Sequence, residues 1–190
     1  MISLKIGKRR FALLAGKLTN DSYSATIKKL ALVRGKGFAQ IAPAGLVAGK
    51  RHVAAALEHA ISAMDDGTAF TRSLELEFIV RLLGEKQLDK VLAVGEMKAG
   101  SGGERGGTVR GLGPGADVIL VSDGKGGKTG ALAKALGIAE AGKFDFSKNR
   151  AALMEFYRIG EKELETVSDL GYEALEELVI ERISMVALER

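Results

Sequence analysis

The chain of 190 residues has no cysteine and no tryptophan, only two prolines, and no apolar run of membrane-spanning length. The absence of cysteine excludes disulfides, thiolate nucleophiles and cysteine metal sites, and it is compatible with a reducing cytoplasm, the location we expect. A bilayer span needs about 18 consecutive apolar residues. At the N-terminus the charged residues follow the apolar ones, which is the reverse of a secretory signal. We therefore expect no membrane partner.

The residues that are present form an ordinary globular composition with an uneven charge. Apolar residues make up 46% and charged residues 27% of the chain, which argues against disorder. The net charge is +4, but residues 1–50 carry ten Lys and Arg against Asp21 alone, a local +9. Residues 144–190 carry six basic and eleven acidic side chains, a local −5. The basic part suits a polyanion and the acidic part a basic protein surface, although a dipolar solvated surface explains the same distribution.

Apolar spacing predicts several helices flanking a small mixed β-sheet in one α/β (α+β) domain that spans 1–190. We expect helices at 49–64, 73–83, 87–94, 129–136, 148–158 and from 172 onward, and strands at 38–42 and 116–122. Thr71 or Ser73 is the expected N-cap of the second helix, and Gly84 its C-cap. Residues 99–115 contain eight glycines and predict a flexible Gly-rich loop.

One segment resembles a phosphate-binding loop. Residues 122–129 follow an apolar strand and precede a helix, which is the context in which backbone N–H groups and a lysine can hold a phosphate. The complete pattern needs a glycine where Ser122 stands, so an ordinary turn explains the segment more simply. Nucleotide binding through Gly124–Thr129 stays an alternative.

Other signatures of catalysis are missing. His52 and His59 stand seven residues apart, about two helical turns, which is too far to chelate one ion. The sequence has no nucleophile elbow and no Ser/His/Asp order typical of a triad. We expect a protein that is not an enzyme and has no cofactor and no metal.

A polar cluster near the middle of the chain is more informative. Lys50 and His52 open one expected helix, Arg72 and Ser73 open the next, and further polar residues lie along and after it. If the two helices pack as an antiparallel pair, helix-opening N–H groups and cations are expected to converge and hold phosphates, with His52, Glu77 or Gln87 touching sugar or base edges. Two helices with ordinary polar faces are the other interpretation.

Two segments resemble a known family. The first runs from Lys50-Arg51-His52-Val53 through SLELEFIVRLLGEKQL at 73–88 to Gly95, and the second from FYRI at 156–159 through LVIERI at 178–183 to Ala187-Leu188. Together they resemble the small kinase-binding regulatory subunit of the KEOPS complex, the PRPK-binding protein (TPRKB) family, in its archaeal type. The chain departs from that family through the stretch 99–115, the extended basic N-terminus, Arg72 in place of a short polar residue, and Lys86 in place of an arginine.

The resemblance implies a non-catalytic role in making threonylcarbamoyl-adenosine in tRNA. Such a subunit binds and stimulates a kinase-like ATPase subunit, and archaeal members recruit tRNA through its single-stranded 3′ CCA end. The tRNA residues implied are Lys50, His52, Arg72, Ser73, Glu77, Arg81, Lys86 and Gln87. For the kinase-like partner we expect exposed positions of the C-terminal helices: Tyr157, Ile159, Glu181 and Met185. A helical adaptor that binds only protein is a further alternative.

Overall fold

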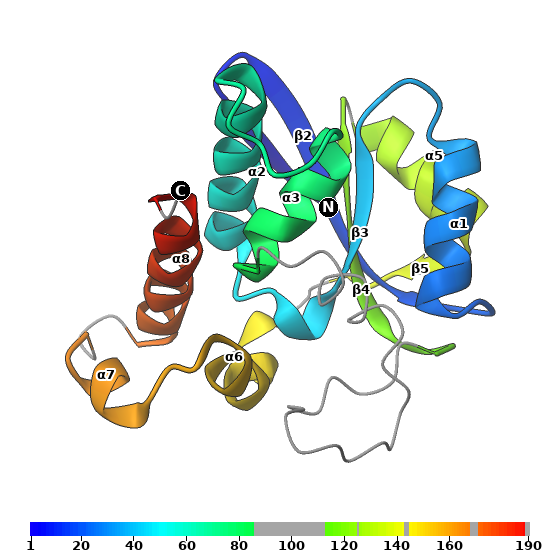
Figure 1. Ribbon diagram of the computed structural model, residues 1–190. Coiled ribbons are helices and arrows are strands. Elements are labelled where there is room, and N and C mark those ends of the chain that lie inside the picture. The colour runs from blue at the N-terminus through cyan, green and yellow to red at the C-terminus, as the bar shows by residue number, and fades with distance from the viewer. Residues whose placement is uncertain (86–112, 125, 143–144, 168–170, 189–190) are drawn as a thin grey trace. The chain divides into compact units, whose positions relative to one another are not determined.

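Figure 1 shows the computed structural model of the chain, which describes residues 1–85, 113–124, 126–142, 145–167 and 171–188. The chain divides into two compact units: unit 1 is Met1–Ala44 with Leu92–Phe144, and unit 2 is Gly45–Val91 with Asp145–Arg190. Helices and an antiparallel sheet are both present, so the predicted α+β class is confirmed. The single domain spanning 1–190 stays a prediction.

Unit 1 is built on a five-stranded sheet with the strand order β1-β2-β4-β3, in which β5 also pairs with β2. Every described pairing is antiparallel, which corrects the predicted mixed sheet. The physical reason is that β1 and β2 form a hairpin through Gly7, while β4 runs between β2 and β3 without a parallel crossover. The elements are β1 (Ile2–Ile6), β2 (Arg9–Leu18), α1 (Tyr23–Val33), β3 (Ala39–Pro43), β4 (Asp117–Asp123), α5 (Gly126–Leu136) and β5 (Ile138–Glu140).

The helices α1 and α5 cover one face of this sheet. Leu30 of α1 and Leu136 of α5 join Leu14 and Leu120 of the strands in one buried cluster. The predicted strand at 116–122 is confirmed as β4, whose residues 118–122 are all buried between two neighbouring strands. The predicted strand at 38–42 corresponds to β3, which ends at Pro43; proline is tolerated there because β3 pairs on one side only.

Unit 2 is helical. Its elements are α2 (Lys50–Asp65), α3 (Leu74–Leu83), the 3₁₀ turn η2 (Phe146–Asn149), α6 (Arg150–Tyr157), α7 (Glu161–Glu165) and α8 (Tyr172–Leu188); the 3₁₀ turn η1 (Ala44–Leu46) lies at the boundary of the units. The predicted caps of α3 are confirmed: Ser73 accepts a hydrogen bond from the N–H of Leu76, and Gly84 has the left-handed φ of 61°.

The helices α2, α3 and α8 pack together in unit 2 (Figure 1). Val53, Leu57 and Phe78 are completely buried, as are Val179 and Ile183 of α8. The start of α2 lies against the end of α3, because Nε2 of His52 is 2.9 Å from the carbonyl oxygen of Leu82. The two helices are therefore antiparallel.

Some predicted features lie outside the described residues: the helix at 87–94 and most of the Gly-rich stretch at 99–115. The predicted helix at 148–158 is a 3₁₀ turn followed by α6. In the parts of the chain that the structure describes, no helix combines the length and the apolar character that crossing a membrane requires.

Candidate functional site

The antiparallel α2–α3 pair separates the polar residues that were expected to converge. Lys50 and His52 lie at the start of α2, which faces the end of α3, whereas Arg72 and Ser73 lie at the start of α3. The 16 residues of α2 extend over about 24 Å at 1.5 Å per residue. The expectation of a single patch formed by two helix openings is corrected, because antiparallel neighbours begin at opposite ends.

The start of α2 already holds an anion from within the chain. Oε1 of Glu176, on α8, accepts hydrogen bonds from the N–H groups of Arg51 at 2.8 Å and His52 at 3.0 Å. The N-cap residue Gly49 has no side chain to supply such an acceptor, and a Cβ there would stand 2.7 Å from the Glu176 carboxyl carbon. Arg51 also pairs with Glu177. These N–H groups, expected to hold a phosphate, are therefore occupied by a carboxylate.

His52 is completely buried, and both of its ring nitrogens form hydrogen bonds inside unit 2. Its Nδ1 accepts from the N–H of Ala48 at 3.2 Å, which assigns the ring proton to Nε2 and makes Nε2 the donor to Leu82. Burial lowers the pKa of His52 to about 4, against a smaller opposing effect of the Leu82 hydrogen bond. The imidazole is thus neutral near pH 7 and is not exposed to a base edge.

Tyr157 of α6 meets the same carbonyl. Its hydroxyl lies 2.8 Å from the oxygen of Leu82 and 3.1 Å from that of Leu46, and burial raises the pKa of this phenol. The rings of Tyr157 and His52 pack edge to face at 5.7 Å. The expectation that Tyr157 faces a partner is corrected, since it is buried and ties α6 to η1, to the start of α2 and to the end of α3. Ile159 is also buried.

Glu77 and Arg81 form a buried ion pair on α3. Nε of Arg81 donates to Oε1 of Glu77 at 2.8 Å, and the exposed fractions of the two side chains are 3% and 0%. Oε2 of Glu77 accepts from the N–H of Thr71 at 3.0 Å, and the guanidinium of Arg81 stands 4.7 Å from the ring centre of Phe70. Both residues are used by the chain itself, which corrects the expectation that they face RNA.

The other residues expected to bind tRNA or the kinase-like partner differ in exposure. Lys50 and Arg72 are exposed, while Ser73 is engaged as the cap of α3. Glu181 and Met185 are exposed one turn apart on α8, with 51% of Met185 accessible. Lys86 and Gln87 lie outside the described residues. Among the described residues, the exposed cations expected to bind RNA are therefore Lys50 and Arg72. They lie at opposite ends of the helical hairpin formed by α2 and α3.

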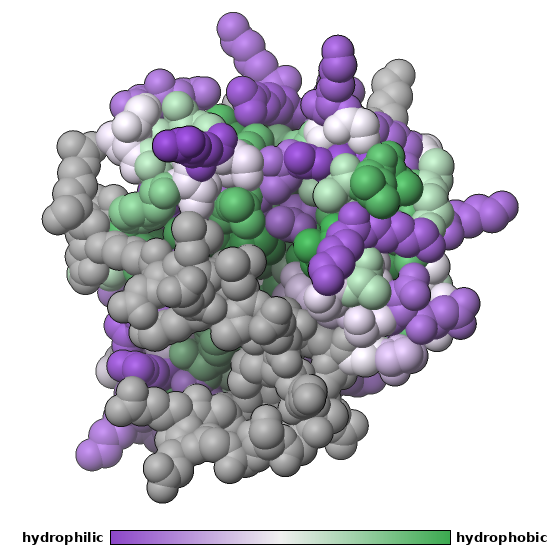
Figure 2. Space-filling view, turned by 45° about the vertical axis from the view of Figure 1, so that its right-hand side comes forward, coloured by the Kyte–Doolittle hydropathy of each residue, from purple (hydrophilic) through white to green (hydrophobic). Residues whose placement is uncertain are grey.

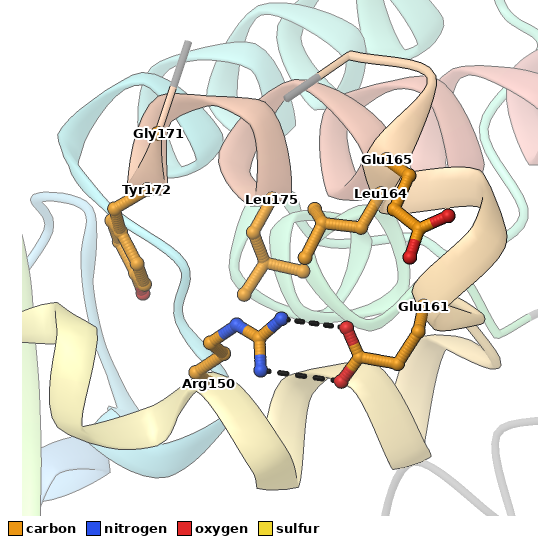
Figure 3. A pocket seen from close by; sticks show the side chains of 7 residues that line it. All are labelled: Arg150, Glu161, Leu164, Glu165, Gly171, Tyr172 and Leu175. Atoms are coloured by element: carbon orange, nitrogen blue, oxygen red, sulfur yellow. Dashed lines mark hydrogen bonds and ion pairs between the residues drawn. The ribbon is translucent and has the colours of Figure 1, made fainter. Parts of the chain in front are cut away.

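A pocket of about 330 Å³ lies between α6, α7 and α8 (Figure 3). Arg150 and Glu161 form a two-pronged ion pair on one side, with N···O distances of 2.8 and 3.3 Å. Leu164 and Leu175 line the pocket with apolar side chains, and Glu165, one turn after Glu161 on α7, lines it as well (Figure 3). No cation of the described residues pairs with Glu165. An apolar wall beside a carboxylate fits the alkyl stem and charged end of a lysine or arginine.

The segment that resembles a phosphate-binding loop does connect a strand to a helix, β4 to α5. Its lysine is already paired, because Nζ of Lys128 is 2.7 Å from Oδ1 of Asp123. The hydroxyls of Ser122 and Thr129 bond each other at 2.7 Å in the interior. Lys125 lies outside the described residues. Among the described residues there is no group of three or more potential metal ligands.

Sequence reasoning missed two features, Glu176 as the acceptor for α2 and the Arg150–Glu161 pocket. Gly49 was a usable signal for the first, since a helix opening on glycine needs its acceptor from elsewhere. No protein-family model and no curated protein sequence matches the chain.

Proposed function

We propose that the chain is a non-catalytic subunit of the KEOPS complex in tRNA threonylcarbamoyl-adenosine modification. In this role it works in the cytoplasm, binds and stimulates the kinase-like ATPase subunit, and recruits tRNA through the 3′ CCA end.

One observation carries the proposal: the two separate segments that resemble this family fold into one unit. The first supplies α2 and α3, and the second supplies the end of α6 and most of α8. They are joined by specific polar bonds as well as by apolar packing, through Glu176 to the start of α2 and through Tyr157 to the end of α3. If the chain belongs to this family, the two segments that resemble it should pack against each other, and in unit 2 they do.

The Lys50 end of the hairpin is the RNA end in this proposal. Lys50 is exposed there, and the end of α3 lies beside the start of α2, with Lys86 and Gln87 following Gly84 closely in the sequence. Because the N–H groups at the start of α2 are taken by Glu176, cationic side chains have to supply the phosphate contacts. Arg72 lies a helix length away and is assigned no part of the 3′-end site.

The surface for the kinase-like partner lies on the C-terminal helices. Glu181 and Met185 present an acidic and an apolar group on α8. The pocket of Figure 3 adds a place for a basic side chain of the partner next to Glu165. Tyr157 and Ile159 are not part of this surface, because both are buried.

The experiment compares the affinity of the chain for intact tRNA and for tRNA lacking its CCA end, at fixed salt because phosphate contacts are salt-dependent. We expect weaker binding of the truncated tRNA. Lys50→Glu should remove this difference, and Arg72→Glu, a matched charge reversal at the other hairpin end, should keep it. Equal affinity of the unaltered chain for both RNAs would overturn the 3′-end proposal. If Arg72→Glu, and not Lys50→Glu, removed the difference between intact and truncated tRNA, the site would lie at the Arg72 end and the proposal would be wrong.

A further inference from the structure

Unit 1 carries a large excess of positive charge that its own acids do not balance. Its described residues include eleven Lys and Arg against four Asp and Glu. Each of the four acids already pairs with a cation: Asp21 with Lys29, Asp117 with Lys17, Asp123 with Lys128, and Glu140 with the N-terminal amine. None of these four ion pairs includes Lys5, Lys8, Arg10 or Lys36.

Several of those cations gather at one end of the sheet. The β1–β2 hairpin turns at Gly7, with a φ of +56°, and carries Lys5, Lys8 and Arg10, all exposed and without an ion pair among the described residues. The carbonyl oxygen of Arg10 accepts from the N–H of Gly124, just after β4. The hairpin can be followed in Figure 1, and Figure 2 shows long hydrophilic side chains projecting from the surface.

The row continues across the sheet to β3. The Asp123–Lys128 pair lies beside Gly37, where an added Cβ would be 2.7 Å from Oδ1 of Asp123, and exposed Lys36 precedes Gly37. Ala39 of β3 is paired with Ser122 of β4, and Phe11 of β2 with Asp123, so these residues share one sheet end. Three strand spacings from β3 to β1 make the row about 14 Å long.

The hairpin also places two like charges directly opposite each other. Lys5 and Arg10 are partners in the register of β1 and β2, so their side chains lie on the same face. Directly opposed like charges destabilise a strand pair. A charge on an edge strand protects against aggregation, and Lys5 on β1 is enough for that purpose. Protection against aggregation therefore does not explain why Arg10 stands opposite Lys5. The arrangement is stabilised when an anion lies over both.

We propose that this row, Lys5, Lys8, Arg10 and Lys36, binds the phosphate backbone of a double-stranded RNA stem. The inference rests on the proposed function for the identity of the RNA, and it places a second contact on the tRNA body, on unit 1. Cations spread from β1 and β2 to the segment before β3 fit repeating phosphates, whereas a single phosphate is normally held by converging donors. The turn residues Gly7 and Lys8 offer no apolar side chain for insertion into a membrane.

The test measures binding of tRNA lacking its CCA end as a function of salt, for the full chain and two triple variants. One is Lys5→Ser/Lys8→Ser/Arg10→Ser; the control is Lys134→Ser/Lys148→Ser/Lys162→Ser, which removes the same charge from three exposed lysines elsewhere. The hairpin variant should bind about ten-fold more weakly or worse near 0.1 M salt, with a log–log salt slope smaller by about 2 to 3. The control should keep its slope.

A second readout excludes a folding defect as the cause. Lys5→Thr removes the opposed charge, so its thermal midpoint should rise while its RNA affinity falls. An unchanged slope in the hairpin triple variant, an equal loss in the control, or tighter binding to phosphatidylglycerol vesicles than to RNA would overturn the inference. Failure of the 3′-end proposal is a separate result, because it appears as equal binding of intact and truncated tRNA by the unaltered chain.

Discussion

Removal of the Glu176 carboxylate should destabilise unit 2 through the start of α2. In Glu176→Ala the N–H groups of Arg51 and His52 lose their acceptor. Hydrogen bonds to a charged group contribute roughly 1.5–3 kcal/mol each. Water can replace the acceptor at exposed Arg51 but not at the buried N–H of His52, so the expected loss is about 3 kcal/mol. Glu176→Gln keeps an oxygen acceptor without the charge and should lose about 1 kcal/mol.

The neighbouring Glu177 supplies a matched control. Its carboxylate pairs with Arg51 at the surface, where 37% of the Glu177 side chain is exposed, so Glu177→Gln should cost less than about 0.5 kcal/mol. Urea unfolding followed by far-UV circular dichroism measures all three variants, with the midpoint and the slope compared. Equal losses in Glu176→Gln and Glu177→Gln, or a stable Glu176→Ala, would refute the assignment of Glu176 as the cap of α2.

Three further perturbations test the interior of unit 2. The pKa of His52 is lowered to about 4 in the folded chain, so between pH 4 and 6.5 the unfolded chain binds more protons than the folded chain. The free energy of unfolding should therefore be fully present above pH 6.5 and should fall by about 3 kcal/mol as the pH drops to 4. An NMR titration should show a neutral His52 ring at pH 6. Glu77→Gln should cost about 3 kcal/mol or more in chemical unfolding, because it leaves the Arg81 charge buried without its partner, and a smaller cost in Glu77→Gln/Arg81→Met would show that the unpaired charge is the cause. Gly49→Ala should lower the thermal midpoint, since its Cβ collides with the Glu176 carboxyl group, and Gly49→Ala combined with Glu176→Ala should cost less than the sum of the two changes.

Local signals predicted much of unit 2. The apolar stripe from Val53 to Met64 has the helical period, and α2 spans Lys50–Asp65. Ser73 and Gly84 bound α3 because an N-cap side chain and a left-handed glycine act within a few residues of the helix end. Such features depend on neighbouring residues only, so a single sequence contains the information.

Pairing across long separations was not predictable in the same way. β2 pairs with β4 from Phe11 opposite Asp123 to Lys17 opposite Asp117, and no local pattern specifies that alignment. The same applies to Glu176, which caps a helix that begins more than a hundred residues earlier. These contacts are selected by the whole fold rather than by the residues on either side.

The candidate site shows why residue type alone was misleading. His52, Glu77 and Arg81 have groups that bind RNA at a surface, and the same groups satisfy a buried carbonyl or one another in the interior. Spacing carried a signal here, since Glu77 and Arg81 stand four residues apart on α3, where side chains meet directly. The exposed residues Lys50 and Met185 carry the binding proposals instead.

The central claim is that the chain acts by binding and not by catalysis, and ATP hydrolysis tests it most directly. The rate is measured for the kinase-like ATPase subunit of the KEOPS complex from the same organism with and without the chain, and for the chain alone. The chain should raise the partner's rate and hydrolyse no ATP itself. Met185→Glu should lose the stimulation, and Leu32→Glu, at an exposed apolar position of unit 1, should retain it. Magnesium-dependent ATP hydrolysis by the chain alone, abolished by Lys128→Ala, would contradict the claim.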